Sequence, residues 1–209
     1  MNSNKWRIVA AWTTVAVLVL SSAAVYAGDR VDGSFFMKNI VVNGEEIVNY
    51  NLQYPFFLHE DATYLPLTAD MQSIFGFAAE LDVEAGTLEL RKTVPTLSNI
   101  RDNRTKNNAE NVTAEVESRF SVRIAEDGAT DSADLIVFEP APRQGARAVD
   151  LGQSPVLVKD DVVYLPLKAF AGSEALGWSL HYDPYFGICV STNEGVSARD
   201  FFSEAEADY

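Results

Sequence analysis

The chain has 209 residues, of which 47% are hydrophobic and 22% charged, a composition typical of a globular protein of one or two domains. Acidic residues outnumber basic ones by 30 to 16, and the formal net charge is −14. Nucleic acids and anionic membrane surfaces attract clusters of Lys and Arg, so this balance argues against both as partners. We expect a solvated acidic exterior, with weak binding of divalent cations or of a basic partner as the alternative.

The N-terminal segment, residues 1–27, has the features of a signal peptide. Lys5 and Arg7 form a basic start, a long uncharged apolar run follows, and small residues precede the expected cleavage site after Ala27. An uncleaved anchor is the alternative, because residues 8–27 are long enough to span a bilayer. Both interpretations predict that the rest of the chain is exported, and is either secreted or held at the cell envelope.

The first folded unit is expected over residues 38–92, after an irregular leader at residues 28–37. Its β-branched and aromatic runs predict short strands, and Asn43-Gly44 is a strong hairpin signal. A second hairpin is expected around Glu60-Asp61, and a closing hairpin follows at residues 77–91.

One short helix is expected within this unit. Apolar residues recur at helical spacing over residues 67–75 and form a single stripe. Pro66 ends the preceding strand because it cannot donate to a strand ladder, and it is tolerated in the first turn of a helix. Gly76 is well placed to end the helix.

A polar connection, residues 93–134, precedes the second unit. Alternating apolar residues at 115–124 predict one or two strands or a short helix, within a partly ordered segment. The second unit is expected over residues 135–192, and an acidic tail over residues 193–209. The chain has one cysteine, Cys189, so no internal disulfide can form, and its apolar surroundings predict a buried, inert thiol.

The second unit repeats the plan of the first. It opens with a strand at 135–138, has a hairpin around Asp160-Asp161, and continues with a helix expected over 167–176 and a last hairpin around residues 183–185. A unit of about 55 residues makes a marginal core, so we expect the two to pack on each other or on a partner. The predicted fold is α+β, with two repeated modules that are each a small antiparallel sheet with one short helix.

The repeat is clearest in one phrase. Tyr64-Leu65-Pro66-Leu67 recurs 100 residues later as Tyr164-Leu165-Pro166-Leu167, and Gly76-Phe77 matches Gly177-Trp178 after one inserted residue. We expect the phrase to have the same structural role in each module: it ends a strand, begins a helix and anchors the core. Gly76 and Gly177 would then end the two helices.

The ordered pattern resembles the copper amine oxidase N-terminal-like domain, also called a stalk domain, which recurs in exported proteins of Gram-positive bacteria. The matching residues are Val42-Asn43-Gly44, Tyr64 to Leu67, Gly76-Phe77 and Asp82 in the first copy, and Tyr164 to Leu167, Gly177-Trp178 and Asp183 in the second. The chain departs from the usual pattern at Thr68 and Lys168, where Arg is common, and the second copy lacks the Asn-Gly opening. The resemblance implies an α+β accessory module for a stalk or adhesion role. It does not imply amine oxidation, because the copper and the quinone of those oxidases lie in a separate, larger domain.

A metal or cofactor site is not expected. Copper needs several nitrogen ligands, and the chain has two histidines, His59 and His181, which are predicted to lie on the surface or at strand edges. The segment Asn49-Tyr50-Asn51 is similar to part of a quinone-forming motif, but Glu46 and Asn51 depart from that motif, and we interpret the similarity as coincidence.

Two pairs of adjacent carboxylates, Glu60-Asp61 and Asp160-Asp161, occupy equivalent predicted turns. Asp is favoured in turns for its backbone geometry, so we interpret both pairs as turn residues. Weak calcium binding is the alternative.

Three aromatic residues have no aromatic counterpart in the first copy: Tyr182, Tyr185 and Phe186. Aromatic side chains on a turn can stack on sugars or anchor a protein partner, so these residues form the candidate binding site. Capping of the core is the alternative.

These features predict a non-catalytic, exported module that binds an envelope protein or wall polymer, or that acts as a spacer. No nucleic acid and no small-molecule substrate is expected. The alternatives are a secreted enzyme with a site between the repeats and an adhesion module stabilised by calcium.

Overall fold

The computed structural model describes residues 29–96, 112–118, 120–125, 146–151, 153–172 and 175–200. Several predictions fall outside these residues: the signal segment 1–27, the strand at 135–138, most of the polar connection and the end of the acidic tail. They remain predictions.

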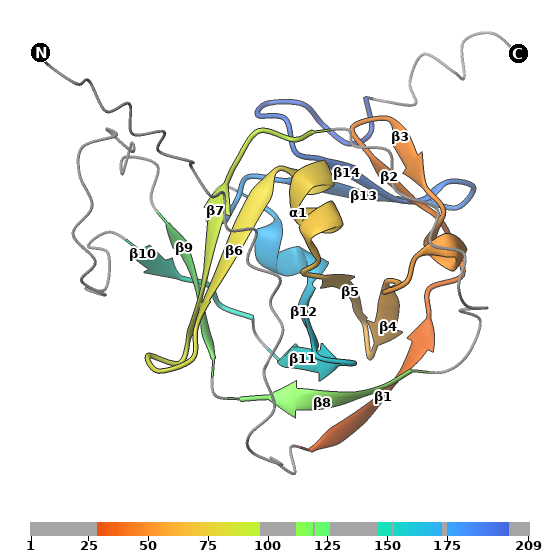
Figure 1. Ribbon diagram of the computed structural model, residues 1–209. Coiled ribbons are helices and arrows are strands. Elements are labelled where there is room, and N and C mark those ends of the chain that lie inside the picture. Colours follow the sequence, from red (N-terminus) through yellow and green to blue (C-terminus); the bar gives the residue numbers. More distant parts are fainter. Residues whose placement is uncertain are drawn as a thin grey trace, which may run out of the picture.

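Six strands close into an antiparallel barrel, seen in the lower right of Figure 1. Their order around the barrel is β1 (Arg30–Phe35), β4 (Phe57–His59), β5 (Ala62–Pro66), β12 (Val162–Pro166), β11 (Val156–Lys159) and β8 (Val112–Glu117), and β8 pairs with β1 to complete the ring. Each neighbouring pair is antiparallel.

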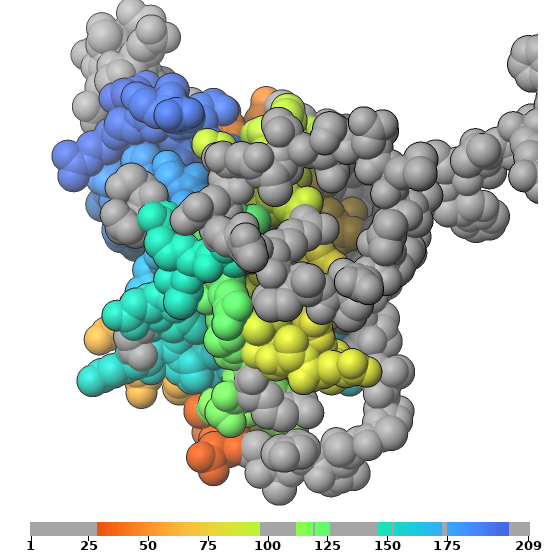
Figure 2. Space-filling view, turned by 90° about the vertical axis from the view of Figure 1, so that its left-hand side faces the viewer, coloured from red at the N-terminus to blue at the C-terminus, as the bar shows by residue number. Residues whose placement is uncertain are grey.

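Two four-stranded sheets flank the barrel. The first has the order β10 (Ala146–Ala148), β9 (Ser121–Ala125), β7 (Thr87–Lys92), β6 (Phe77–Asp82), and the second has the order β13 (Ser179–Asp183), β14 (Gly187–Ser191), β2 (Ile40–Val42), β3 (Glu45–Ile47). In each sheet one parallel pair, β7–β9 or β14–β2, joins segments distant in the sequence. Figure 2 shows this for the first sheet, where the β6–β7 hairpin in yellow lies beside β9 in green and β10 in teal.

The predicted α+β fold of two separate modules is wrong. The structure is mostly β, and its central feature is one closed barrel built from strands of both copies. Among the described residues, α1 (Ala69–Phe75) is the one α-helix, and η1 (Asn49–Asn51) and η2 (Leu167–Phe170) are single 3-10 turns. The physical reason is burial: two small sheets would each leave a face exposed, whereas a shared barrel also pairs their edges.

The segments predicted to be irregular or uncertain supply barrel strands. Residues 30–35, expected to belong to a leader, form β1, and residues 112–117 of the connection form β8. Residues 121–125 form β9, which joins the first sheet. Elements β1 to β7 of the first half (residues 29–96) therefore recur in the same order as β8 to β14 of the second half (residues 112–200).

The two copies of the repeated phrase pair with each other. Strands β5 and β12 are antiparallel neighbours, with Leu65 opposite Leu165, Tyr64 opposite Pro166 and Pro66 opposite Tyr164. Such reciprocal pairing is the pattern of a two-fold interface, here formed within one chain. The two halves therefore meet along the phrase itself, in addition to the β1–β8 pair, and the local two-fold axis passes between the two leucines.

Alternation along β5 and β12 divides the core in two. Tyr64 and Tyr164 pack with Phe57 in a cluster that also contains Ala62, Val112, Ala114 and Leu157, all from barrel strands. The ring of Phe57 lies 5.4 Å from that of Tyr64 and 4.9 Å from that of Tyr164. The intervening leucines belong to the larger core cluster, where Phe170 stacks on Trp178 at 4.5 Å and Phe75 stacks on Trp178 at 5.2 Å.

The hairpin and helix predictions are confirmed for the first half. Asn43 and Gly44 have φ values of 51° and 88°, as a type I′ turn requires, and join β2 to β3. Helix α1 begins after Thr68, whose side chain accepts a hydrogen bond from the Met71 amide, and it ends at Gly76 with φ 67°. The carboxylate pairs lie at hairpin turns, where Glu60, Asp160 and Asp161 have positive φ.

The predicted second helix is wrong in extent. It was expected over residues 167–176, with Gly177 as its end, but η2 stops at Phe170 and Ala171 forms a bridge with Trp178. Gly172, in the position that Gln72 holds in α1, has φ +77° and no neighbouring atom where a Cβ would lie. A left-handed glycine interrupts a helix, so this substitution accounts for the shorter element.

Side-chain amides hold distant backbone segments together. Asn49, 1% exposed, donates to the carbonyls of Phe36 and Phe56 and accepts from the Phe56 amide. Asn43 donates to the Thr192 hydroxyl and accepts from the Thr192 amide, both at 2.9 Å, and so ties the β2–β3 turn to the end of β14.

The two barrel tyrosines differ in their hydrogen bonding. The Tyr64 hydroxyl donates to the Pro155 carbonyl at 3.1 Å, whereas the Tyr164 hydroxyl is buried with no hydrogen-bond partner among the described residues. Burial raises the pKa of Tyr64 to about 12, and burial also raises the pKa of Tyr164.

We predict that matched substitutions of these tyrosines have opposite effects. Tyr64→Phe loses the hydrogen bond to the Pro155 carbonyl, so the free energy of unfolding falls by about 1 kcal/mol. Tyr164→Phe removes an unpaired buried hydroxyl, so it leaves stability unchanged or raises it by up to about 1 kcal/mol. Urea denaturation of both variants measures the difference. A larger loss for Tyr164→Phe than for Tyr64→Phe contradicts this account of the barrel interior.

Candidate functional site

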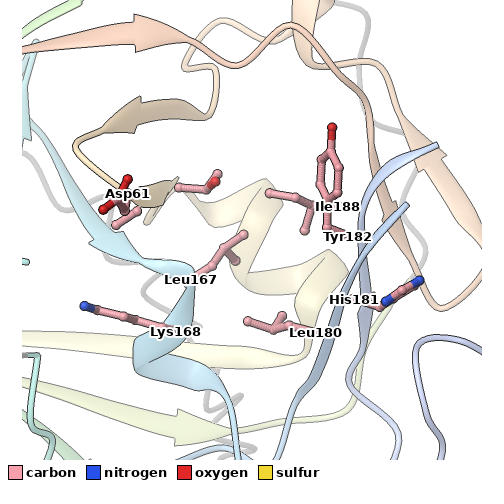
Figure 3. A pocket seen from close by; sticks show the side chains of 9 residues that line it. Asp61, Leu167, Lys168, Leu180, His181, Tyr182 and Ile188 are labelled. Carbon is pink, nitrogen blue, oxygen red and sulfur yellow. The ribbon is translucent and has the colours of Figure 1, made fainter. Parts of the chain in front are cut away.

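A groove opens between the barrel and the β13–β14 hairpin. It encloses about 230 Å³ and is lined by Asp61, Ala62, Thr63, Leu167, Lys168, Leu180, His181, Tyr182 and Ile188. The first three come from the turn and start of the β4–β5 hairpin, the next two from η2 and the rest from β13 and β14. Figure 3 shows Leu167, Leu180 and Ile188 gathered at the centre, so the floor of the groove is aliphatic.

The groove exists because the two halves differ. In the first half, Gln72 of α1 donates to the Leu67 carbonyl at 3.3 Å and accepts from the Ala79 amide at 3.0 Å, so the helix bridges the strand end and β6. Leu67 and Ala79 correspond to Leu167 and Leu180, which both line the groove. The short η2 turn contributes no such bridge, and that surface is left open.

The groove wall is also larger and more apolar than its counterpart in the first half. Trp178 directly precedes β13, and Leu180 and Tyr182 continue its face along the strand, as Ala79 and Leu81 follow Phe77 on one face of β6. Ala79 is buried in the core, whereas Leu180 is half-buried and Tyr182 is 56% exposed.

The structure brings Tyr182 to the groove and places Tyr185 and Phe186 on the adjacent turn, residues 184–186. Tyr185 is 89% exposed and Phe186 is 45% exposed, so neither is buried as a cap on the core would be. The candidate binding residues thus lie along one hairpin, with Tyr182 at the groove and Tyr185 at its tip.

This aromatic turn (residues 184–186) is held in a defined conformation. The Asp183 carboxylate accepts hydrogen bonds from the amides of Tyr185 at 2.7 Å and Phe186 at 2.9 Å, and these bonds lower the pKa of Asp183. Lys38 donates to the Pro184 carbonyl at 3.0 Å. Gly187, at φ +93°, approaches the chain before β2 so closely that a Cβ would lie 2.3 Å from the Asn39 carbonyl oxygen.

The titratable side chains at the groove do not point to one centre. Asp61 lies on the β4–β5 turn and Lys168 on η2, and Figure 3 shows the ring of His181 directed away from Leu180 and Tyr182. His181 instead accepts a hydrogen bond from the Arg199 side chain at 3.4 Å. The other histidine, His59, contacts the Asp32 carbonyl at 3.0 Å.

Two further predictions concern metal ligands and the thiol. No group of three or more His, Cys, Asp or Glu residues gathers in the described part of the chain. Cys189 is buried in the centre of the second sheet, as predicted, and burial raises the pKa of its thiol to about 11.

The aliphatic floor was not predicted from the sequence. A comparison of the copies contains the signal: Ala79, Leu81 and Thr87 become Leu180, Tyr182 and Ile188 after the one-residue offset. Larger apolar residues at positions that remain near the surface indicate a face with something to bind.

In comparisons with known proteins, no family model matches the chain, and neither a curated protein nor a solved structure matches it at a significant level. Within the described ranges, no helix has the length and apolar character needed to cross a membrane.

We predict that the backbone amides of the aromatic turn report the charge of Asp183. Because two amides donate to its carboxylate, the charged form is favoured and the carboxyl titrates below its ordinary pKa of 3.8. The amide proton resonances of Tyr185 and Phe186 should shift together with that midpoint in an NMR titration. Asp183→Asn should abolish the shared titration, and a midpoint at or above 3.8 in the unmodified protein contradicts the proposed turn geometry.

Proposed function

We propose that the protein is a non-catalytic, exported module of the cell surface or envelope, which binds a protein or a wall polymer through the aromatic turn and the groove. The observation that carries the proposal is the position of Tyr182 and Tyr185, two large exposed aromatic side chains on one ordered hairpin beside an apolar groove. Tyrosine supplies a large contact area with a polar hydroxyl, which suits stacking on sugars and anchoring of protein partners.

The order of the turn supports a binding role. A flexible loop loses conformational freedom when it binds, and this loss subtracts from affinity. The aromatic turn is already held by Asp183, by Lys38 and by the close approach of Gly187 to Asn39. The backbone of the turn is therefore already ordered before a ligand binds, and less conformational freedom is lost on binding.

The size of the groove supports a macromolecular ligand over a small molecule. Pockets that hold small molecules enclose roughly 300–1,000 Å³ and bury most of the ligand. The groove encloses about 230 Å³, which suits one or two side chains or a sugar unit of a larger ligand.

The location is supported by the sequence. Residues 1–27 have the pattern of a signal peptide, and the resemblance of both copies to the stalk-type domain agrees with an exported accessory module. The absence of a possible internal disulfide is consistent with a protein whose stability rests on its core and barrel.

The proposal predicts that ligand capture depends on the two tyrosines. Residues 28–209 are immobilised and offered two purified preparations from the source organism: envelope proteins, and wall polymer freed of protein. The double variant Tyr182→Ala/Tyr185→Ala should lose at least tenfold in affinity for one of them, because both side chains are exposed and their removal leaves the core intact.

The matched control is Val83→Ala/Glu84→Ala on the β6–β7 turn, which holds the corresponding place in the first half and is also exposed. It should retain full binding. Equal binding by the tyrosine variant, or no binding of the unmodified chain to either preparation, contradicts the proposed function.

A further inference from the structure

We propose that the groove is the anchor site for a short segment of a partner protein, which places an apolar side chain between Leu167, Leu180 and Ile188 and carries Lys or Arg beside it. This inference rests on the proposed function and selects a protein over a wall polymer as the ligand.

The first half of the molecule shows what covers this surface when it is closed. There the gap between Leu67 and β6 is covered by α1, whose Gln72 bonds to the backbone on both sides. The corresponding gap between Leu167 and β13 is open, because Gly172 stands where Gln72 would be and η2 ends at Phe170. The surface is thus shaped to be covered by a polypeptide segment, and the described residues at that position of the second half do not supply one.

The floor of the groove favours a peptide over a carbohydrate. Leu167, Leu180 and Ile188 offer only aliphatic carbon, which suits an apolar side chain better than a polyhydroxylated sugar ring. An apolar side chain in this position gains from the removal of both surfaces from water, in the manner of an interface hot spot. The polar lining residues, Asp61, Thr63, Lys168, His181 and Tyr182, can form hydrogen bonds with the rest of the segment.

The charges around the groove favour a basic residue beside the apolar residue of the partner segment. Glu60 and Asp61 are exposed on the β4–β5 turn at one wall, and Asp183 carries a negative charge at the end of β13. The whole chain has a net charge of −14, so an acidic segment or an anionic wall polymer is repelled at long range. Among the lining residues Lys168 offsets the charge of Asp61, so the expectation of a basic partner side chain rests on the further exposed carboxylate of Glu60 and on the net charge of the chain.

The test is selection from a displayed library of random twelve-residue peptides on immobilised residues 28–209. We expect the enriched peptides to share an apolar residue with Lys or Arg within three positions. Synthetic copies should lose at least fivefold in affinity when Asp61, an exposed turn residue, is changed to Lys, and this loss should shrink at high salt. Leu180→Asp should lower affinity at least tenfold.

Controls separate a blocked groove from an unfolded protein. Val83→Asp on the opposite hairpin should not change peptide affinity, and the melting temperature of Leu180→Asp must show that it remains folded. Asp61 is an exposed turn residue, so the Asp61→Lys variant should fold. It therefore still tests the inference if Leu180→Asp does not fold. An acidic or wholly polar consensus, no enriched peptide, or binding that Asp61→Lys does not change overturns the inference.

A binding experiment with purified wall polymer distinguishes failure of the peptide inference from failure of the proposed function. If purified wall polymer binds and that binding is lost in Tyr182→Ala/Tyr185→Ala and Leu180→Asp, while no peptide is enriched, the peptide inference fails and the proposed function stands. If neither polymer nor protein binds, the proposed function fails as well.

Discussion

The rest of the structure depends on the antiparallel pairing of β5 with β12, in which Leu65 lies opposite Leu165. This pair joins the two halves of the barrel at one seam, as the β1–β8 pair does at the other, and it sets both leucines against the shared core. Because β5 leads into α1 and β12 leads into η2, it also fixes where these elements start. Leu67 and Leu167, the last residues of the two copies of the phrase, are buried by that arrangement.

Neither half completes its own sheets. The β13–β14 hairpin of the second half pairs with β2 of the first, and the β6–β7 hairpin of the first half pairs with β9 of the second. Asn43 adds side-chain hydrogen bonds to Thr192 across the same boundary. Each half therefore depends on its contacts with the other half for much of its stability. This is expected, because a unit of about 55 residues cannot bury enough apolar surface alone.

The candidate site is where this near-symmetry fails. Both halves place a strand end, a helical element and a hairpin in the same relation, and in the first half α1 fills the space between them. In the second half one glycine, Gly172, shortens the helical element, and larger apolar residues line the space that remains. The aromatic turn lies at the end of the same hairpin, and Tyr182 of that hairpin lines the groove.

Local features were predictable from the sequence, and partnerships between distant segments were not. The Asn43-Gly44 turn and the end of α1 at Gly76 follow from the backbone preferences of those residues. The barrel was not predicted, because residues 30–35, which include Gly33, were interpreted as part of an irregular leader. In the structure that glycine is required, since a Cβ would lie 2.7 Å from the Leu58 carbonyl oxygen of the neighbouring strand. Only the closed barrel reveals that contact.

The candidate site, too, was predictable only in part from the sequence. Tyr182, Tyr185 and Phe186 stood out in the sequence because the first copy has no aromatic residue at their positions. The aliphatic floor could not be assigned, because Leu180 and Ile188 are typical core residues whose exposure depends on how far η2 extends. The helical pattern at 167–176 predicted a full helix, and a full helix would have covered them.

The central claim is that the two halves complete each other, and separation of the chain tests it most directly. Residues 28–96 and 97–209 are produced as two fragments, and amide NMR spectra and thermal melting are recorded for each alone and for the equimolar mixture. We predict that neither fragment folds cooperatively as a monomer and that the mixture forms a 1:1 complex with dispersed resonances. A dispersed spectrum and a cooperative transition from either fragment alone, as a monomer, would contradict it.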